Sequence, residues 1–498
     1  MARRMVARAR TAGPMVVPTA VPRVRPTTAR PVSPVVTTVV PTAGPMVART
    51  RAPGPTTVRP TAGPVVTVAR TAVPTVRRSA DMTALADPVG QSVSDCPTVR
   101  RCVAVAPEVF AAEHWGRRPL VSPAAELPRP FDDLLTLADV DELLSRRGLR
   151  TPFLRVARNG DVISSDQFTR GGGVGAEVAD QVGDDQVARL FDQGCTLVLQ
   201  GLHRLWPPLI ELAGRLSSEL GHPAQINAYI TPPSSQGFAA HFDVHDVFVL
   251  QVAGQKRWRV HEPVHEDPLR SHHWDKYRDQ VAERAGESPV IDRVLSPGDA
   301  LYLPRGYLHS AKALGEVSAH LTVGVHVLTR YALVEALLGL AGAERDLRTT
   351  LPLGIDAADP DQIAPHLAET VEVLARVLGE IAPGEVARRV RDRVWSGSRP
   401  QPLAPIAQAA AASSVRVGDG VRLREGVRFR LGFEGESVVL ELPGNQLTLP
   451  ASTGPALATL LAGASCVIGE LPGLPGADQV VLVRRLLREG VLVPACGS

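Results

Sequence analysis

The sequence predicts an α+β fold whose centre is a double-sheet β barrel of the jelly-roll or cupin type. From residue 225 onward, short runs rich in β-branched and aromatic residues are separated by tight turns that read AGQK, SPGD and PRG. Amphipathic helical patterns precede and follow this segment. Short strands joined by tight turns are typical of closed or double-sheet β architectures, so we expect a double-stranded β-helix with flanking helices.

Composition narrows the class of protein. At 498 residues and 44% hydrophobic content, the chain is long enough for several domains, each with its own core. No uninterrupted apolar run approaches the roughly 18–20 residues that span a bilayer, so we expect no membrane partner. The five cysteines are scattered without metal-type spacing, which is typical of a reducing compartment and predicts a cytoplasmic protein.

The net charge of +3 averages two unlike regions. Residues 1–80 hold 13 arginines, 13 prolines, no lysine and no acid, so residues 81–498 carry a net charge of −10. The phrase TAGPMV occurs at 11 and 42 and returns as TAGPVV at 61, and prolines at this density interrupt helices and sheets. We therefore expect residues 1–95 to be a disordered, Arg/Pro-rich, low-complexity segment. A basic tail that contacts nucleic acid is the alternative.

The barrel domain is expected at residues 105–328. Within it, helical patterns predominate in a lead-in at 105–222, and the β-rich barrel itself covers 223–328. Amphipathic patterns over 329–397 predict helices, and a Pro- and Ala-rich linker follows at 398–414.

The last part of the chain, residues 415–498, combines paired strands, two helices and a final strand. This order resembles a winged helix, a fold that often binds DNA. However, residues 401–498 hold 8 arginines and 8 acids, so their net charge of zero provides no electrostatic footprint for phosphates. We favour a protein-contact or structural role, and we do not expect the folded part of the chain to bind nucleic acid.

The most informative short motif is HFDVHD, residues 241–246. If it lies in a strand, His241, Asp243 and His245 share one face. A distant run, YLPRGYLHSA, supplies His309 as a third ligand, and two histidines with one carboxylate form the facial set of non-haem Fe(II) oxygenases. A lone His-x-Asp pair is more often a solvated turn or a core histidine. His245 could replace His241 or Asp243 as a ligand, although a role beside the site or in lining the pocket is favoured.

A longer stretch carries a family resemblance. The run NAYITPPSSQGFAAHFDVHDVFVLQVAGQKRWRV (227–260), together with SPGDALYLPRGYLHSA and SAHLTVGVH, resembles the JmjC-type 2-oxoglutarate oxygenases. More narrowly, it is similar to the ribosomal oxygenase group, and the resemblance covers about residues 105–498. It implies Fe(II) as cofactor with 2-oxoglutarate and O2 as cosubstrates. The implied metal ligands are His241, Asp243 and His309, and the implied contacts of the 2-oxoglutarate C5 carboxylate are Lys256, Asn227 and Tyr229.

The pattern around Lys256 agrees with that implication. Lys256 follows a glycine-containing turn, and alternation places it on one face with Trp258 and Val260. A compact ammonium on a flexible stem suits a carboxylate deep in a narrow barrel. An exposed hairpin lysine is the alternative, although lysine is rare in this arginine-rich chain.

The sequence departs from the family at one point. Relatives often place a small hydroxyl residue late in the HLTVGVH strand, where this chain has Gly324 and Val325. Ser318 and Thr322 remain as polar candidates for that part of the site. Two aromatic residues nearby, Trp258 and Tyr302, could line the pocket, with core packing as the favoured role for both.

The resemblance implies a hydroxylase that acts on a protein side chain, with a ribosomal protein as the implied substrate and succinate and carbon dioxide as coproducts. Two alternatives stay open. One is the same chemistry on a small molecule or a peptide natural product. The other is a non-enzymatic, metal-binding cupin regulator with a DNA-contacting winged helix. The resemblance also assigns residues 329–397 to homodimerisation, with packing inside one chain as the alternative.

Overall fold

The computed structural model of the chain describes residues 96–158 and 160–495. The predicted disordered segment at 1–95 therefore lies outside the described residues. Among the residues that are described, no helix is long and apolar enough to cross a membrane.

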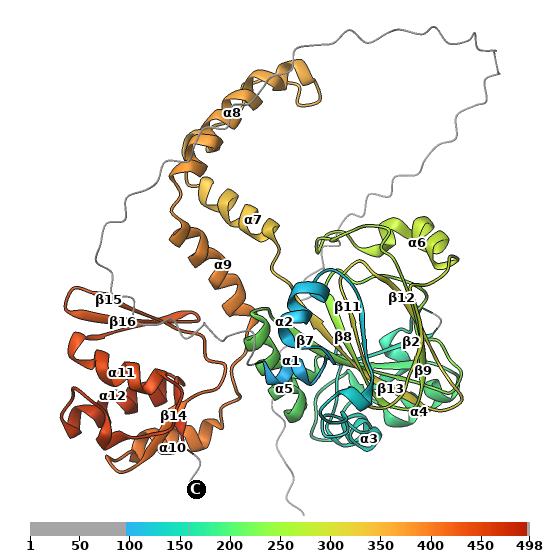
Figure 1. Ribbon diagram of the computed structural model, residues 1–498, viewed down its shortest axis with the longest axis horizontal. Helices are drawn as coiled ribbons and strands as arrows, with labels where there is room; N and C mark the ends of the chain where they lie inside the picture. Colours follow the sequence, from blue (N-terminus) through green and yellow to red (C-terminus); the bar gives the residue numbers. More distant parts are fainter. Residues whose placement is uncertain (1–95, 159, 496–498) are drawn as a thin grey trace, which may run out of the picture. The chain divides into compact units, whose positions relative to one another are not determined.

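An eight-stranded antiparallel sheet forms the larger wall of the barrel (Figure 1). Its three central strands, β7, β8 and β13, are each eight residues long and rich in buried β-branched side chains. The strands follow one another across the sheet in the order β1 (Leu120–Ser122), β11 (Ala300–Leu303), β8 (Asp246–Ala253), β13 (Ser318–Val325), β7 (Ala224–Thr231), β6 (Thr196–Leu199), β2 (Leu154–Arg158) and β3 (Asp161–Val162).

A three-stranded sheet forms the second wall, in the order β10 (Ile291–Leu295), β9 (Lys256–His261) and β12 (Leu308–Ala313). Buried side chains from both sheets pack between the walls, among them Val247, Val249, Trp258, Val260, Leu301 and Leu303. The predicted barrel with flanking helices is thereby confirmed. Between β9 and β10 the chain adds a short helical segment that ends in α6 (Arg278–Ala285).

Helices cover the outer face of the large sheet (Figure 1). The longest is α5 (Pro207–Leu220), whose buried Leu209, Leu212 and Leu216 recur at helical spacing and join the core on this face. The other helices of this region are α1 (Pro97–Arg100), α2 (Pro107–Val109), α3 (Leu137–Arg146) and α4 (Asp184–Asp192). The carboxylate of Glu219 near the end of α5 accepts hydrogen bonds from the backbone N–H groups of Thr98 and Val99, which ties α1 to α5.

The expectation of a helical lead-in at 105–222 is incomplete. This region also contributes β1, β2, β3 and β6 to the large sheet, and it forms the small pair β4 (Thr169–Arg170) and β5 (Gln181–Val182). These strands have two to five residues, and in apolar runs of that length periodicity does not separate a strand from a buried helix.

Three helices follow the barrel, as the amphipathic patterns over 329–397 predicted. They are α7 (Arg330–Ala341), α8 (Pro360–Glu380) and α9 (Pro383–Gly397). An ion pair between Glu335 and Arg393 joins α7 to α9. None of the 21 residues of α8 is buried.

The predicted linker at 398–414 is only partly a linker, because its second half is helix α10 (Pro405–Ser414). The buried amide of Gln408 donates hydrogen bonds to the carbonyls of Leu487 and Leu492, at 2.9 and 2.8 Å, so α10 belongs to the C-terminal core. That core also contains α11 (Gly454–Leu461), α12 (Gly476–Arg488) and two three-stranded sheets. The strands are β14 (Gly420–Leu423), β18 (Cys466–Val467) and β19 (Leu492–Pro494), and β15 (Arg430–Glu434), β16 (Ser437–Leu442) and β17 (Asn445–Pro450).

Candidate metal centre and cosubstrate cavity

The HFDVHD segment brings His241 beside His309 through the backbone. The strand considered for this segment begins only at Asp246, and His241 instead makes a single antiparallel bridge to His309. In this bridge the N–H of each residue donates to the carbonyl of the other, at 3.2 and 2.8 Å. As a result, the two imidazole ring centroids lie 4.5 Å apart.

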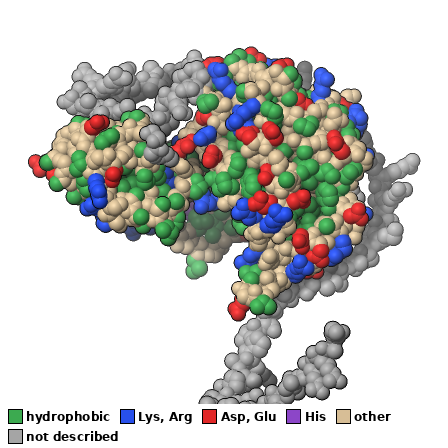
Figure 2. Space-filling view, turned by 90° about the horizontal axis from the view of Figure 1, so that it is seen from below, with side chains coloured by type: hydrophobic (Ala, Val, Ile, Leu, Met, Phe, Trp, Pro, Cys, Tyr) green, Lys and Arg blue, Asp and Glu red, His purple; other side chains and the backbone are tan. Residues whose placement is uncertain are grey.

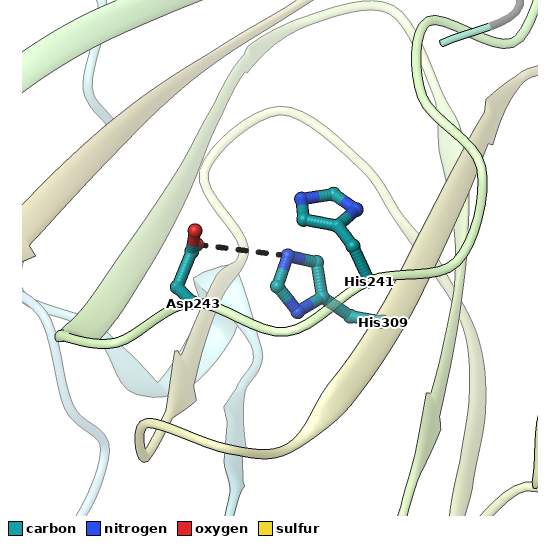
Figure 3. Close-up of side chains that lie close together, drawn as sticks. All are labelled: His241, Asp243 and His309. Carbon is teal, nitrogen blue, oxygen red and sulfur yellow. Dashed lines mark ion pairs between the residues drawn. The ribbon is translucent and has the colours of Figure 1, made fainter. Parts of the chain in front are cut away.

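Both imidazoles are oriented by backbone carbonyls. His241 Nδ1 lies 2.8 Å from the Ala239 carbonyl, and His309 Nδ1 lies 3.1 Å from the Tyr307 carbonyl. Each Nδ1 therefore carries the proton and donates it, which leaves the Nε2 lone pair free to bind a metal. His309 Nε2 is 3.8 Å from an Asp243 carboxylate oxygen, as Figure 3 shows.

The ligand atoms of His241, Asp243 and His309 all lie within 4.8 Å of one another. Among the described residues, no other group of three histidine, cysteine or acidic side chains converges in this way. Two imidazoles and one carboxylate leave further coordination positions open, which suits non-haem Fe(II). The donor set and its orientation thus fit the predicted metal.

The electrostatics keep these groups in their metal-binding protonation states. Burial, and next the neighbouring His241, lower the pKa of His309 to about 4. Burial raises the pKa of Asp243, but His245, His309, His241 and Arg155 outweigh it, so the net pKa of Asp243 is lowered. At neutral pH His309 is neutral and Asp243 is anionic, as metal binding requires.

His245 does not join this group. Residues 244 and 245 form a bend before β8, so the alternation that would align His245 with Asp243 is broken. Its ring instead lies over Gly324, where an added Cβ would be only 3.0 Å from His245 Cε1, and it packs edge-on against His326 at 5.4 Å. The glycine that departs from the family pattern therefore leaves room for this histidine.

A small cavity of about 60 Å³ runs from the metal ligands into the space between the two sheets. Lys256 lies in its wall, 3% exposed, and its Nζ donates to Thr231 Oγ1 at 2.9 Å and lies 3.4 Å from His320 Nδ1. Burial lowers the pKa of Lys256 to about 7. The other lining residues are Thr196, Tyr229, Gly237, Phe238, Val247, Val249, Trp258, Ser310, Ala311, His320 and Thr322.

The remaining predicted site residues separate into two groups. Tyr229 and Thr322 line the cavity, and Tyr229 stacks on His320 with ring centroids 5.1 Å apart. Asn227 does not line the cavity, because its side-chain oxygen accepts a hydrogen bond from the Gly201 N–H at 3.0 Å. Ser318 is buried outside the cavity and accepts from the Gln251 amide at 2.9 Å.

The two aromatic residues also differ. Trp258 lines the cavity, with its buried Nε1 lacking a hydrogen-bond partner among the described residues. Tyr302 is a core residue, as favoured from the sequence, and its hydroxyl donates to the buried Asp246 carboxylate at 2.5 Å.

Sequence reasoning missed several polar neighbours of the cavity, among them Thr231, His320 and Arg155. Thr231 and His320 could have been found by extending the strand alternation, since they lie two residues from Tyr229 and Thr322 respectively. Arg155 gave no such signal, because β2 is far from the motif segment in sequence.

Comparison with known proteins identifies the central segment. Residues 208–333 match the family model described as "JmjC domain". This segment is a JmjC domain. It contains the three converging side chains and Lys256.

Curated proteins are similar to the chain over stretches longer than residues 208–333. "Ribosomal oxygenase 1" of Rattus norvegicus is 34% identical over 229 residues, which cover 42% of this chain and 38% of the relative. "Ribosomal oxygenase 1" of Gallus gallus is 32% identical over 303 residues, covering 57% and 47%. "Bifunctional lysine-specific demethylase and histidyl-hydroxylase NO66" of Aedes aegypti is 30% identical over 255 residues, covering 50% and 38%. The chain thus spans less than half the length of these relatives.

Among solved structures, the ribosomal oxygenase YcfD of Escherichia coli is 19% identical, with a TM-score of 0.47, over 79% of this chain and 99% of that protein. YcfD has also been solved in complex with cobalt and 2-oxoglutarate.

Proposed function

We propose that this chain is an Fe(II)- and 2-oxoglutarate-dependent oxygenase that hydroxylates a side chain of a ribosomal protein. The observation that carries the proposal is the convergence of His241, Asp243 and His309 at a cavity whose wall contains the buried Lys256. A barrel that binds only a metal has no need of a buried ammonium in the wall of the same cavity.

The roles follow from the geometry. His241, Asp243 and His309 would hold Fe(II), which, when bound with 2-oxoglutarate and O2, supplies the oxidising chemistry and yields succinate and carbon dioxide. Lys256 would bind the C5 carboxylate of 2-oxoglutarate, because an ammonium in a dry cavity favours an anion strongly. Apolar walls such as Val247, Val249 and Trp258 exclude water from this site.

The substrate class is supported by the relatives. The similar curated proteins are named as ribosomal oxygenases or as bifunctional lysine-specific demethylases and histidyl-hydroxylases, and the second name refers to amino-acid side chains. On the face seen in Figure 2, basic and acidic side chains are interspersed, so that face offers no single-sign patch for nucleic acid.

The experiment is mass spectrometry of ribosomal proteins from cells with and without the gene. A ribosomal protein that loses a shift of about 16 Da in the deletion strain, and regains it with wild type but not with Asp243→Ala, supports the proposal. Succinate formation without any ribosomal target would favour a small molecule or a peptide natural product. Metal binding without 2-oxoglutarate turnover would favour the non-enzymatic cupin regulator.

We also propose that residues 329–397 form a homodimer interface. Helix α8 carries Ile363, Leu367, Val371, Leu374 and Leu378 at helical spacing, yet none of them is buried, and Leu367 and Val371 are more than half exposed. A second copy of the chain would cover this stripe. Leu367→Glu should convert a dimer into a monomer in light scattering coupled to gel filtration, whereas Glu369→Ala on the same helix should not.

For the C-terminal part, residues 415–498, we propose a winged-helix-like domain with a structural or protein-contact role, supported by its two helices and paired strands. A cytoplasmic location is supported by the free thiols of Cys102, Cys195 and Cys466.

A further inference from the structure

A row of side chains crosses the large sheet beside the cavity. Arg155 of β2 lies opposite Val198 of β6, and Val198 lies opposite Tyr229 of β7. Tyr229 in turn lies opposite His320 of β13. Directly opposed residues of antiparallel strands project to the same face, so all four side chains point toward the small sheet. The row therefore connects a distant arginine to the cavity that holds Lys256.

Arg155 reaches across this row to Tyr229. Two interstrand spacings of roughly 4.8 Å separate their backbones. Because Val198 between them is short and fully buried, the long arginine side chain can pass over it. The Arg155 guanidinium lies over the Phe238 ring, with Cζ 5.3 Å from the centroid. The Phe238 ring in turn packs edge-on against Tyr229, with ring centroids 6.0 Å apart.

The arginine retains hydrogen-bonding capacity at this position. Its Nε is buried and has no hydrogen-bond partner among the described residues. Its charge acts on Asp243, where it contributes to lowering the pKa of the carboxylate. A buried, unused donor on a charged group is unfavourable for stability, so its retention points to a role at the site.

The phenol of Tyr229 has one proton to donate. Burial, and next the charge of Asp243, raise the pKa of Tyr229 to about 12, so the phenol stays protonated at neutral pH. A guanidinium has donors only, so in a hydrogen bond between these two side chains the Tyr229 oxygen is the acceptor. The Tyr229 O–H is then free to donate to a group other than Arg155. Hydrogen bonds in series strengthen one another.

We propose that Arg155 is a positioning residue for the cosubstrate: by donating to the Tyr229 oxygen, it directs the Tyr229 hydroxyl to donate to the carboxylate that Lys256 binds. The inference rests on the proposed function, since it assigns Arg155 to the same 2-oxoglutarate site. Arg155 acts through Tyr229 and does not itself touch the cosubstrate.

A double-mutant cycle tests the proposal. The affinity of the Mn(II)-loaded protein for 2-oxoglutarate is measured by calorimetry for the wild type, Arg155→Met, Tyr229→Phe and the double variant. We expect each single variant to bind about tenfold more weakly, because each breaks a hydrogen bond in the same charged series. The double variant should bind as Tyr229→Phe does, since Arg155 has no separate route to the ligand.

The controls separate positioning from folding. Arg158→Met removes an exposed arginine from the same strand and should leave 2-oxoglutarate affinity unchanged. Mn(II) affinity and thermal melting should be unchanged in Arg155→Met. If that variant does not fold, Arg155→Lys, which keeps the charge but not the planar fork, should also weaken binding. Equal affinity of Arg155→Met and wild type, or additive losses in the double variant, would overturn the inference. Failure of the wild type to bind 2-oxoglutarate would instead overturn the proposed function.

Discussion

The metal end of the cavity and the Lys256 end carry opposite charges and are built in different ways. At the metal end, backbone carbonyls orient both histidines and the carboxylate of Asp243 is anionic before any ion enters. At the other end, the contacts of Lys256 are a hydroxyl and a neutral imidazole, and among the described residues it has no acidic partner. The first end is preorganised for its ligand, while the second is left electrostatically incomplete until an anion arrives.

This difference shows that the Lys256 end of the cavity destabilises the ligand-free fold. A buried ammonium without a counter-ion disfavours the folded state, and proteins keep such groups mainly at functional sites. At the metal end, the ligands already have their binding geometry, so little reorganisation is needed when the metal binds. At the Lys256 end, the ammonium has no counter-ion in the free protein, so the binding of an anion is more favourable. Each prediction below tests one side of this contrast.

The largest effect is expected at the metal end. Asp243→Ala removes the one anionic ligand and should reduce Fe(II) or Mn(II) affinity by more than the roughly 10–100-fold loss that follows from removing an outer partner. His241→Ala should behave similarly. Metal titration checks this, with the exposed Asp275→Ala as a control of equal charge change. Retention of metal by both ligand variants would show that the converging group is not the metal site.

The second-largest effect is expected at the Lys256 end of the cavity. Lys256→Ala should weaken 2-oxoglutarate binding by about two to three and a half decades, since a buried ion pair that loses one partner costs on the order of 3–5 kcal/mol. Metal affinity should be unchanged, which distinguishes the two ends. Calorimetry on the Mn(II)-loaded protein measures both, and Lys312→Ala removes an exposed lysine of β12 as the matched control. Equal affinity in wild type and Lys256→Ala would remove Lys256 from the site.

The low pKa of Lys256 predicts that the affinity for 2-oxoglutarate depends on pH. The pKa of Lys256 is about 7 in the free protein, and a bound carboxylate raises it by favouring the ammonium. Above pH 7 binding therefore takes up a proton, and 2-oxoglutarate affinity should fall by up to about tenfold per pH unit. Calorimetry in buffers of different ionisation enthalpy should detect this uptake, and Lys256→Met should abolish it. A wild-type affinity that does not change between pH 7 and 9 would contradict the prediction.

Removing the uncompensated charge should also stabilise the ligand-free fold. Burial depresses the pKa of Lys256 from 10.5 to about 7, so the unfolded chain binds more protons between these values and wild-type stability rises with pH across that window. Lys256→Met keeps the side-chain volume and should gain about 1–3 kcal/mol, most below pH 7 and least near pH 10. Denaturant unfolding of both proteins at several pH values measures the gain. A destabilised Lys256→Met would mean that the bond to Thr231 outweighs the buried charge.

Local spacing predicted the site better than it predicted the surroundings of the site. The structure brings His241 and Asp243 together with His309, although the strand from which this was argued begins only at Asp246. The two-residue spacing was sufficient because the segment is extended at the bridge to His309. Arg155 could not be predicted, since its relation to Tyr229 depends on the order β2–β6–β7 across the sheet. Periodicity within one segment carries no information about which strands become neighbours.

The smallest effect is expected at His245, where the same local argument failed. The bend at residues 244 and 245 turns its ring onto Gly324, and its Nδ1 is buried without a hydrogen-bond partner among the described residues. His245 contributes to the lowered pKa of Asp243, so it belongs to the surroundings of the metal ligands.

We therefore expect His245→Ala to keep metal affinity within about tenfold of the wild type, at the low end of losses from outer partners. Parallel metal titrations of His245→Ala and His241→Ala provide the comparison, because the two variants delete the same side chain four residues apart. If His245→Ala lost the metal while His241→Ala retained it, the ligand set would be Asp243, His245 and His309. The bend before β8 would then have to straighten on metal binding, and the metal end would lose the preorganisation that distinguishes it from the Lys256 end.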